Sequence, residues 1–118
     1  MKGQGFQRRL GFALQGLQRT VGTERSFRTH LFAAAAVLLV LLVTRPAPLW
    51  WAVLGLAVAA VLMAELFNTA LETLIDHVHP EQHPEIGAAK DIAAGAVLIA
   101  SAAAVVVAVA FVVDWLGG

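Results

Sequence analysis

The chain has 118 residues, of which 59% are hydrophobic and only 14% are charged, and its mean hydropathy is +0.78. Because soluble domains contain about 25% charged residues, these values argue against a soluble domain and predict an integral membrane protein. The absence of cysteine excludes disulfides, thiolate nucleophiles and cysteine metal sites. The eight basic and eight acidic residues give a net charge of zero, so the distribution of the charges along the chain is more informative than their sum.

The first segment, residues 1–25, has the pattern of a basic amphipathic helix. Apolar residues recur every three or four positions, and basic or amide side chains occupy the other face. The apolar positions are Phe6, Leu10, Leu14, Leu17 and Val21, and the polar positions are Arg8, Arg9, Gln15, Gln18 and Arg19. Such a helix lies in a membrane interface. A frayed, solvated segment is the alternative, because glycines within it weaken the helix.

Three apolar blocks follow. The first is long enough to span a membrane if it occupies residues 26–44, and the proline-rich turn at 45–48 ends it. The second helix is expected at 49–79, with a polar extension after its apolar part. A polar, proline-containing loop is expected at 80–89 and a third span at 90–115. These expectations define an all-α integral membrane protein with three transmembrane helices and an N-terminal surface helix.

Basic residues predict the orientation. Seven of the eight fall on one side of the predicted membrane, namely Lys2, Arg8, Arg9, Arg19, Arg25, Arg28 and Lys90, and only Arg45 falls on the other. The side with the excess of basic residues is cytoplasmic. The N-terminus, the polar extension and the loop would therefore face the cytoplasm.

The polar extension of the second helix carries the candidate chemistry. At about 100° per residue, Glu72 and Asp76 each fall within roughly 20° of Glu65 on a helix, and Asn68 flanks them. Carboxylates this close repel one another and are costly beside lipid, and a bound cation relieves both costs. A solvated helical extension is the simpler alternative. Glu65 argues against it, because it lies directly against the apolar block.

Lys90 and Asp91 add a cation and another acid at the same membrane level. Carboxylates for Mg²⁺ and a lysine for phosphate are the groups that phosphoryl transfer needs. The chain has neither a GxxxxGK(S/T) loop nor a glycine-rich loop of the protein-kinase type, so nucleotide binding would use another kind of site. A histidine metal centre at residues 77–83 is disfavoured, because prolines interrupt the helical spacing.

Two runs of polar residues resemble the signature of the small prokaryotic diacylglycerol kinase family, which also includes undecaprenol kinases. They are Glu65-x-x-Asn68-Thr69-Ala70-x-Glu72-x-x-x-Asp76 and Ala89-Lys90-Asp91-x-Ala93-Ala94-Gly95-Ala96-Val97. The resemblance extends upstream through Glu24-x-x-Phe27-Arg28 and covers residues 5–115. It implies a homotrimer with active sites between subunits. It also implies direct transfer of the γ-phosphoryl group of ATP, with Mg²⁺, to a lipid alcohol.

The resemblance also implies roles for individual residues. Glu65 would be the general base on the lipid hydroxyl, with Asn68 and Asp76 orienting and supporting it. Glu24 and Glu72 would hold the metal and contact ATP. The other expected nucleotide contacts are Arg8, Glu81, Gln82, His83, Lys90 and Asp91, and the expected lipid contacts besides Glu65 are Arg28 and Ala94.

The acceptor lipid stays open between undecaprenol and diacylglycerol. Residues 23–27, 83–84 and 93–97 look somewhat more like the undecaprenol kinase branch of the family. The alternative function is a small oligomeric transporter or channel that binds cations. A transporter would place ionisable residues in the middle of a span, whereas Ser101 is the only polar residue expected there. A protein that served only as a structural membrane anchor would not need its polar residues at one membrane level. These residues are Glu65, Asn68, Glu72, Asp76, Lys90 and Asp91.

Overall fold

The structure is a computed structural model that describes residue 3 and residues 5–118. The described part contains four helices, α1 (Phe6–Thr23), α2 (Arg25–Thr44), α3 (Pro48–Val78) and α4 (Pro84–Gly117). Residues 1, 2 and 4, within the predicted surface helix, lie outside the described residues. The all-α class predicted from the sequence is confirmed.

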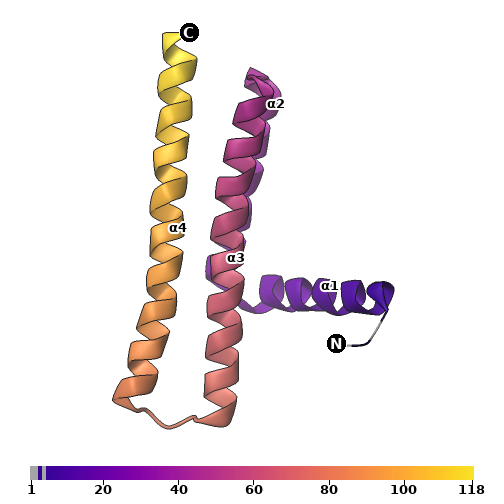
Figure 1. The fold of residues 1–118 in the computed structure, drawn as a ribbon, viewed down its shortest axis with the longest axis vertical. Coiled ribbons are helices and arrows are strands. Elements are labelled where there is room, and N and C mark those ends of the chain that lie inside the picture. Colours follow the sequence, from indigo (N-terminus) through magenta and orange to yellow (C-terminus); the bar gives the residue numbers. More distant parts are fainter. Residues whose placement is uncertain (1–2, 4) are drawn as a thin grey trace.

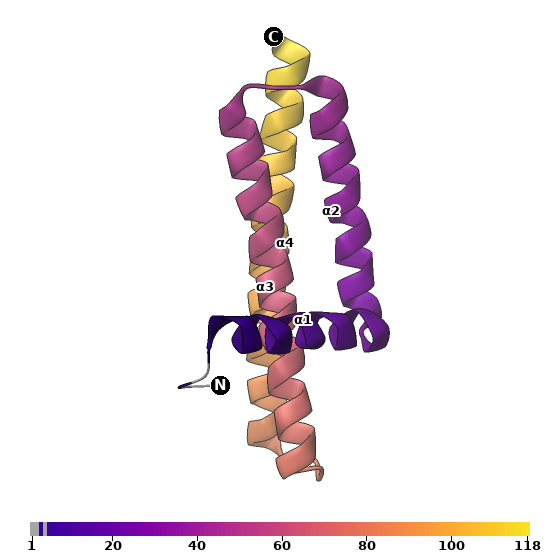
Figure 2. The ribbon, with the colours of Figure 1, turned by 90° about the vertical axis from the view of Figure 1, so that its right-hand side faces the viewer.

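Three of the helices are long and apolar enough to cross a membrane. At 1.5 Å per residue, α2 is about 30 Å long, α3 about 46 Å and α4 about 51 Å. The hydrocarbon core of a bilayer is about 30 Å thick. The helices α3 and α4 therefore exceed one membrane thickness, and Figure 2 shows both continuing past the level at which α2 begins. This projecting part of α3 contains the predicted polar extension.

Helix α1 lies at a steep angle to the other three helices and extends away from α3 on the side opposite α4 (Figure 1), at the level of the first residues of α2 (Figure 2). The chain bends at Glu24, whose extended backbone (φ −110°, ψ 107°) separates the two helices. The Glu24 N–H donates to the Thr20 carbonyl at 2.8 Å and closes the last turn of α1. The apolar residues of α1 are exposed, including Phe6 and Leu14.

The turn between α2 and α3 is short, as its prolines predict. Arg45 adopts the left-handed conformation (φ 46°, ψ 59°), and its N–H donates to the Leu41 carbonyl at 2.9 Å. This geometry ends a helix. Pro48 then occupies the start of α3, where its missing N–H costs nothing. Only three residues separate α2 from α3, so the two helices run antiparallel, as Figure 2 shows.

The connection between α3 and α4 is shorter than the loop predicted at 80–89. Helix α4 begins at Pro84, so the connection is limited to residues 79–83. His83 caps the helix, because its Nδ1 atom accepts a hydrogen bond from the Glu85 N–H at 3.1 Å. Proline is well suited to the first position of a helix. Pro84 therefore starts α4 six residues before Lys90, the predicted start.

Few side chains are buried within the chain. Leu41, Leu54 and Phe111 form a small cluster near the α2–α3 turn, and Phe27 and Val61 are the other buried apolar residues in the described part. Helix α3 packs along α4 and more briefly along α2 (Figures 1 and 2). Most apolar side chains of the long helices face outward, as expected for surfaces covered by lipid or by further subunits.

Candidate active site

Glu65 is the most buried ionisable residue of the described chain, with 5% of its surface exposed. It lies in α3, opposite the first turns of α2, and both of its polar contacts come from that helix. The Ser26 hydroxyl donates to Glu65 Oε1 at 2.7 Å. The His30 Nδ1 atom lies 3.1 Å from the same oxygen, although the direction of that contact is not that of a hydrogen bond.

Asn68 and Glu72 continue along α3 from Glu65 towards the projecting end. Both are partly buried. The Asn68 Oδ1 atom is buried and accepts no hydrogen bond from the described part of the chain. Because a buried carbonyl oxygen without a donor is costly, this atom is suited to a donor that lies outside the described chain.

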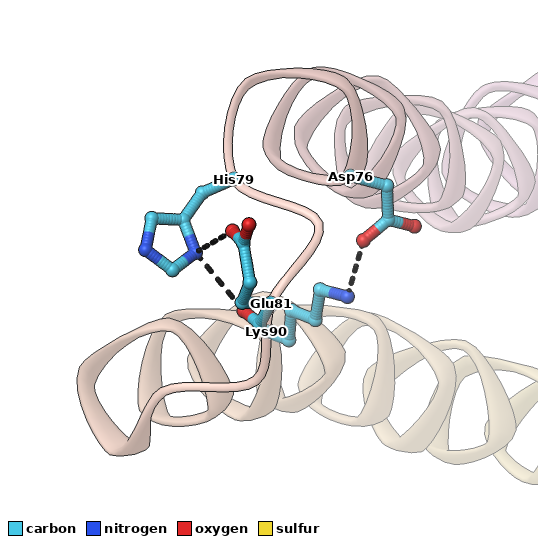
Figure 3. A network of polar contacts seen from close by, with 4 residues as sticks. All are labelled: Asp76, His79, Glu81 and Lys90. Atoms are coloured by element: carbon cyan, nitrogen blue, oxygen red, sulfur yellow. Dashed lines mark hydrogen bonds and ion pairs between the residues drawn. The ribbon is translucent and has the colours of Figure 1, made fainter.

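Asp76 and Lys90 connect α3 to α4 near the connecting loop. The Lys90 ammonium donates to Asp76 Oδ1 at 2.6 Å (Figure 3). In the same view, His79 Nδ1 lies 2.9 Å from the Glu81 carbonyl and 3.6 Å from Glu81 Oε2. A pocket of about 460 Å³ lies here, which we call the loop pocket. It is lined by Asp76, residues 79–84, Ile86, Gly87 and Lys90.

The loop pocket therefore brings together five of the residues predicted to act in the site: Asp76, Glu81, Gln82, His83 and Lys90. Asp91 follows Lys90 on α4 and is exposed. The pocket offers an ammonium group, carboxylates and imidazoles at the end of the molecule that projects beyond the level of α1 (Figure 1). The ammonium group is suited to contact a phosphate, and the carboxylates would favour a cation bound beside it.

Glu24 lies apart from the loop pocket, in an open groove of about 890 Å³ between α1 and α3. We call it the α1–α3 groove. The α1 side offers small residues such as Gly16 and Thr20, and the α3 side offers Thr69 and His77. No group of three or more His, Asp or Glu residues in the described part is close enough to hold a metal ion. Any divalent cation would therefore need ligands from elsewhere.

The remaining predicted residues are exposed. Arg8 lies on α1, Arg28 on α2 and Ala94 on α4. The Arg28 Nη1 atom donates to the Val21 carbonyl at 2.8 Å and so links α2 to the end of α1. The Arg28 side chain therefore stabilises the bend at Glu24 between α1 and α2.

Two neighbours of Glu65 were not among the predicted site residues. Ser26 and His30 lie in the first span predicted at residues 26–44 and were assigned no role in the site from the sequence. Their spacing of four residues places both on one face of α2. That spacing shows that the two side chains share a face but does not show that the face meets Glu65.

Comparisons with known proteins support the resemblance to the prokaryotic diacylglycerol kinase family. The sequence model described as prokaryotic diacylglycerol kinase matches residues 11–112. An undecaprenol kinase of Bacillus subtilis is 38% identical over 85 residues, which are 72% of this chain and 69% of the relative. A diacylglycerol kinase of Synechocystis sp. is 39% identical over 97 residues, 81% of this chain and 55% of the relative. A diacylglycerol kinase of Haemophilus influenzae is 30% identical over 89 residues, 75% of each chain.

The three apolar helices and these similarities together define an integral membrane lipid kinase. The chain belongs to the prokaryotic diacylglycerol kinase family. The aligned part spans 55% of the Synechocystis relative, so that protein is much longer than the region it shares with this chain.

Proposed function

We propose that the protein transfers the γ-phosphoryl group of ATP to the hydroxyl group of undecaprenol or diacylglycerol at the cytoplasmic surface of a bacterial inner membrane. The products would be undecaprenyl phosphate or phosphatidic acid, together with ADP. The observation that carries the proposal is a buried carboxylate, Glu65, on an apolar helix whose projecting end leads to the loop pocket. One relative is named undecaprenol kinase and two are named diacylglycerol kinase.

Glu65 is proposed as the general base. It lies near the level at which α2 begins, where the hydroxyl group of a lipid would emerge from the hydrocarbon core. In the proposed step, the lipid oxygen forms a bond to the γ-phosphorus and the bond from that phosphorus to the bridging oxygen of ADP breaks. The hydroxyl proton passes to the Glu65 carboxylate. The burial of Glu65 keeps water away from its carboxylate, which favours the lipid hydroxyl over water as the phosphoryl acceptor.

The nucleotide is proposed to bind along the projecting ends of α3 and α4. Lys90 would contact the phosphates, and residues 81–83 of the loop pocket would contact the rest of the nucleotide. Asp91 and Arg8 would add contacts. Asp76 already pairs with Lys90 and would hold its ammonium group in place for a phosphate. Asn68 would use its buried, unpaired Oδ1 atom to orient groups beside Glu65.

Mg²⁺ is proposed to accompany ATP, held by Glu24 and Glu72. The described chain offers carboxylates but no cluster of three ligands. This arrangement fits Mg²⁺, which is commonly held by one or two carboxylates with substrate phosphates and water as the other ligands. When bound, the ion would supply positive charge that offsets the charge of the transferring phosphoryl group.

A homotrimer is proposed, with each site formed between neighbouring subunits. The α1–α3 groove is open in the single chain, and most apolar side chains of the spans are exposed. Both features leave room for neighbouring subunits to complete the site. Helix α1 is proposed to lie in the cytoplasmic membrane surface. Its steep angle to the three long helices and its exposed apolar residues favour this placement. Arg28 and Ala94 are proposed lipid contacts.

The test is phosphate transfer from labelled ATP by the purified protein in detergent micelles. Undecaprenol and diacylglycerol are offered separately, each with and without Mg²⁺. We expect Mg²⁺-dependent transfer to at least one lipid, and the ratio of the two rates identifies the acceptor. The relatives divide between the two acceptors at 38% and 39% identity, so this ratio has to be measured. Transfer to neither lipid by a folded sample would overturn the proposal, and cation flux in vesicles would then be tested.

A further inference from the structure

We propose that Ser26 and His30 are positioning residues that hold Glu65 by its Oε1 atom, so that Oε2 is the oxygen that receives the proton of the lipid hydroxyl. The inference rests on the proposed function, because it assumes that Glu65 is the base. It adds two residues of α2 to the reaction and assigns separate tasks to the two oxygens of one carboxylate.

The two contacts of Glu65 reach the same oxygen. The Ser26 hydroxyl donates to Oε1 at 2.7 Å, and the His30 Nδ1 atom lies 3.1 Å from Oε1. Among the described residues, neither the hydrogen bonds nor the ion pairs of Glu65 involve Oε2. A carboxylate held through one oxygen cannot exchange its two oxygens by rotation without breaking these contacts. Oε2 is therefore left available for a proton.

The position of these two residues is set by helix packing. Ser26 and His30 are one turn apart on α2, so they face α3 together. Phe27, between them in sequence, is 2% exposed and anchors the first turn of α2. The packing of this turn fixes the distance between α2 and Glu65. Small errors in the position of a reacting group are costly, because catalysis depends on orientation.

Among the described residues, the buried Nδ1 atom of His30 has no other polar partner. The Nδ1 atom is buried and makes no hydrogen bond, although a carboxylate oxygen lies 3.1 Å away. With the proton on Nδ1, a modest rotation of the ring would align this atom with Oε1 and satisfy both groups. The imidazole would then become the second donor to Oε1, beside the Ser26 hydroxyl. A positioning role thus accounts for an atom that the rest of the described chain leaves unpaired.

A purely structural role is the competing explanation. Ser26 and His30 could simply join α2 to α3, in which case their removal would affect folding or binding and not the rate of the chemical step. The two explanations differ in the separation of kcat from KM. They also differ in whether a side chain with a similar donor can replace the original one.

The experiment compares Ser26→Ala with Ser26→Thr, and His30→Leu with His30→Asn. The second variant of each pair keeps a donor close to the original position, and asparagine places its amide nitrogen near the site of Nδ1. The matched control is Thr29→Ala, which removes an exposed α2 hydroxyl that donates to the Arg25 carbonyl of its own helix. Each variant is assayed for kcat, for KM towards ATP and lipid, and for MgATP binding.

We expect Ser26→Ala and His30→Leu to lower kcat about 10- to 100-fold, while MgATP binding and KM for ATP stay close to those of the wild type. We expect Ser26→Thr and His30→Asn to recover most of the loss, and Thr29→Ala to behave as the wild type. An unchanged kcat in Ser26→Ala and His30→Leu would overturn the proposal. It would also be overturned if His30→Asn bound MgATP but were as slow as His30→Leu.

The failure of this inference can be told apart from failure of the proposed function. A wild-type protein that transfers no phosphate to either lipid would overturn the proposed function itself. A wild-type protein that transfers phosphate, with a Glu65→Gln variant that is equally fast, would overturn the role of Glu65 as base and this inference with it. If Glu65→Gln is inactive and the α2 variants are fully active, only the positioning role fails.

Discussion

The ammonium group of Lys90 donates a hydrogen bond of 2.6 Å to Asp76 Oδ1, and this contact joins the end of α3 to the beginning of α4 (Figure 3). The Asp76 side chain is 63% exposed and the Lys90 side chain 34% exposed, so the pair is open to solvent. Open pairs of this kind contribute little to stability. A phosphate group in the loop pocket could approach Lys90 without first unfolding either helix.

Replacing Lys90 by methionine is therefore expected to affect catalysis much more than folding. The ammonium group would be lost from the proposed phosphate-binding region, and kcat/KM for ATP should fall about 100-fold. Initial rates at varied ATP concentration measure the effect, with Lys90→Arg as the control that keeps the positive charge. Wild-type kinetics in Lys90→Met would remove Lys90 from the nucleotide site.

Glu65→Gln should abolish turnover while MgATP still binds. Glutamine keeps an oxygen that can accept from Ser26, but it cannot take a proton from a lipid hydroxyl. General-base catalysis contributes about 10²- to 10⁴-fold, so at most about 1% of the wild-type kcat should remain. Single-turnover phosphate transfer and nucleotide binding, measured on the same sample, separate the two steps. Substantial turnover by the variant would be inconsistent with Glu65 as the base.

The fold could be predicted because its signals are local. Apolar runs of adequate length mark the spans, and the prolines at 46 and 48 mark the turn between α2 and α3. The start of α4 was misplaced because Pro84 was included in the loop predicted at 80–89. In the structure, His83 supplies a cap and Pro84 begins the next helix. Proline is common both in loops and at the first position of a helix. Only the hydrogen bond that caps the helix at His83 shows that Pro84 begins α4.

The candidate site was predictable only along one helix at a time. Helical periodicity placed Glu65, Asn68, Glu72 and Asp76 on a common stripe of α3. Contacts between helices depend on how the helices are rotated and how far each extends, and no local pattern specifies this. The sequence placed Lys90 and Asp76 at one membrane level but did not predict their hydrogen bond. For the same reason it did not predict the contact of Ser26 and His30 with Glu65.

Glu72→Gln tests the proposed metal site. A carboxylate that holds Mg²⁺ supplies charge that a neutral amide cannot replace. The Mg²⁺ concentration that gives half the maximal rate should rise about tenfold or more. Rates measured across a Mg²⁺ titration at saturating ATP detect the shift. Glu85→Gln is the matched control, because it removes a carboxylate that is exposed in the first turn of α4. The same Mg²⁺ dependence in Glu72→Gln and the wild type would exclude Glu72 from the metal site.

Trp50 and Asp114 provide a test of stability at the opposite end of the helices from the loop pocket. The Trp50 Nε1 atom donates to Asp114 Oδ2 at 2.9 Å and joins the first turn of α3 to the end of α4. The Trp50 ring also packs edge-on against Phe111, with 5.4 Å between the ring centroids. Phenylalanine at position 50 would keep an aromatic ring near Phe111 but would lose the hydrogen bond.

We expect Trp50→Phe to lower the free energy of unfolding by about 1 kcal/mol and to leave phosphate transfer unchanged, because the contact is remote from Glu65. Denaturation in detergent micelles, followed by circular dichroism, measures the change. Asp114→Ala should destabilise the protein similarly, and adding Trp50→Phe to it should cost little more, since the hydrogen bond is already gone. If the two changes were instead fully additive, the hydrogen bond would not be the interaction that links these helix ends.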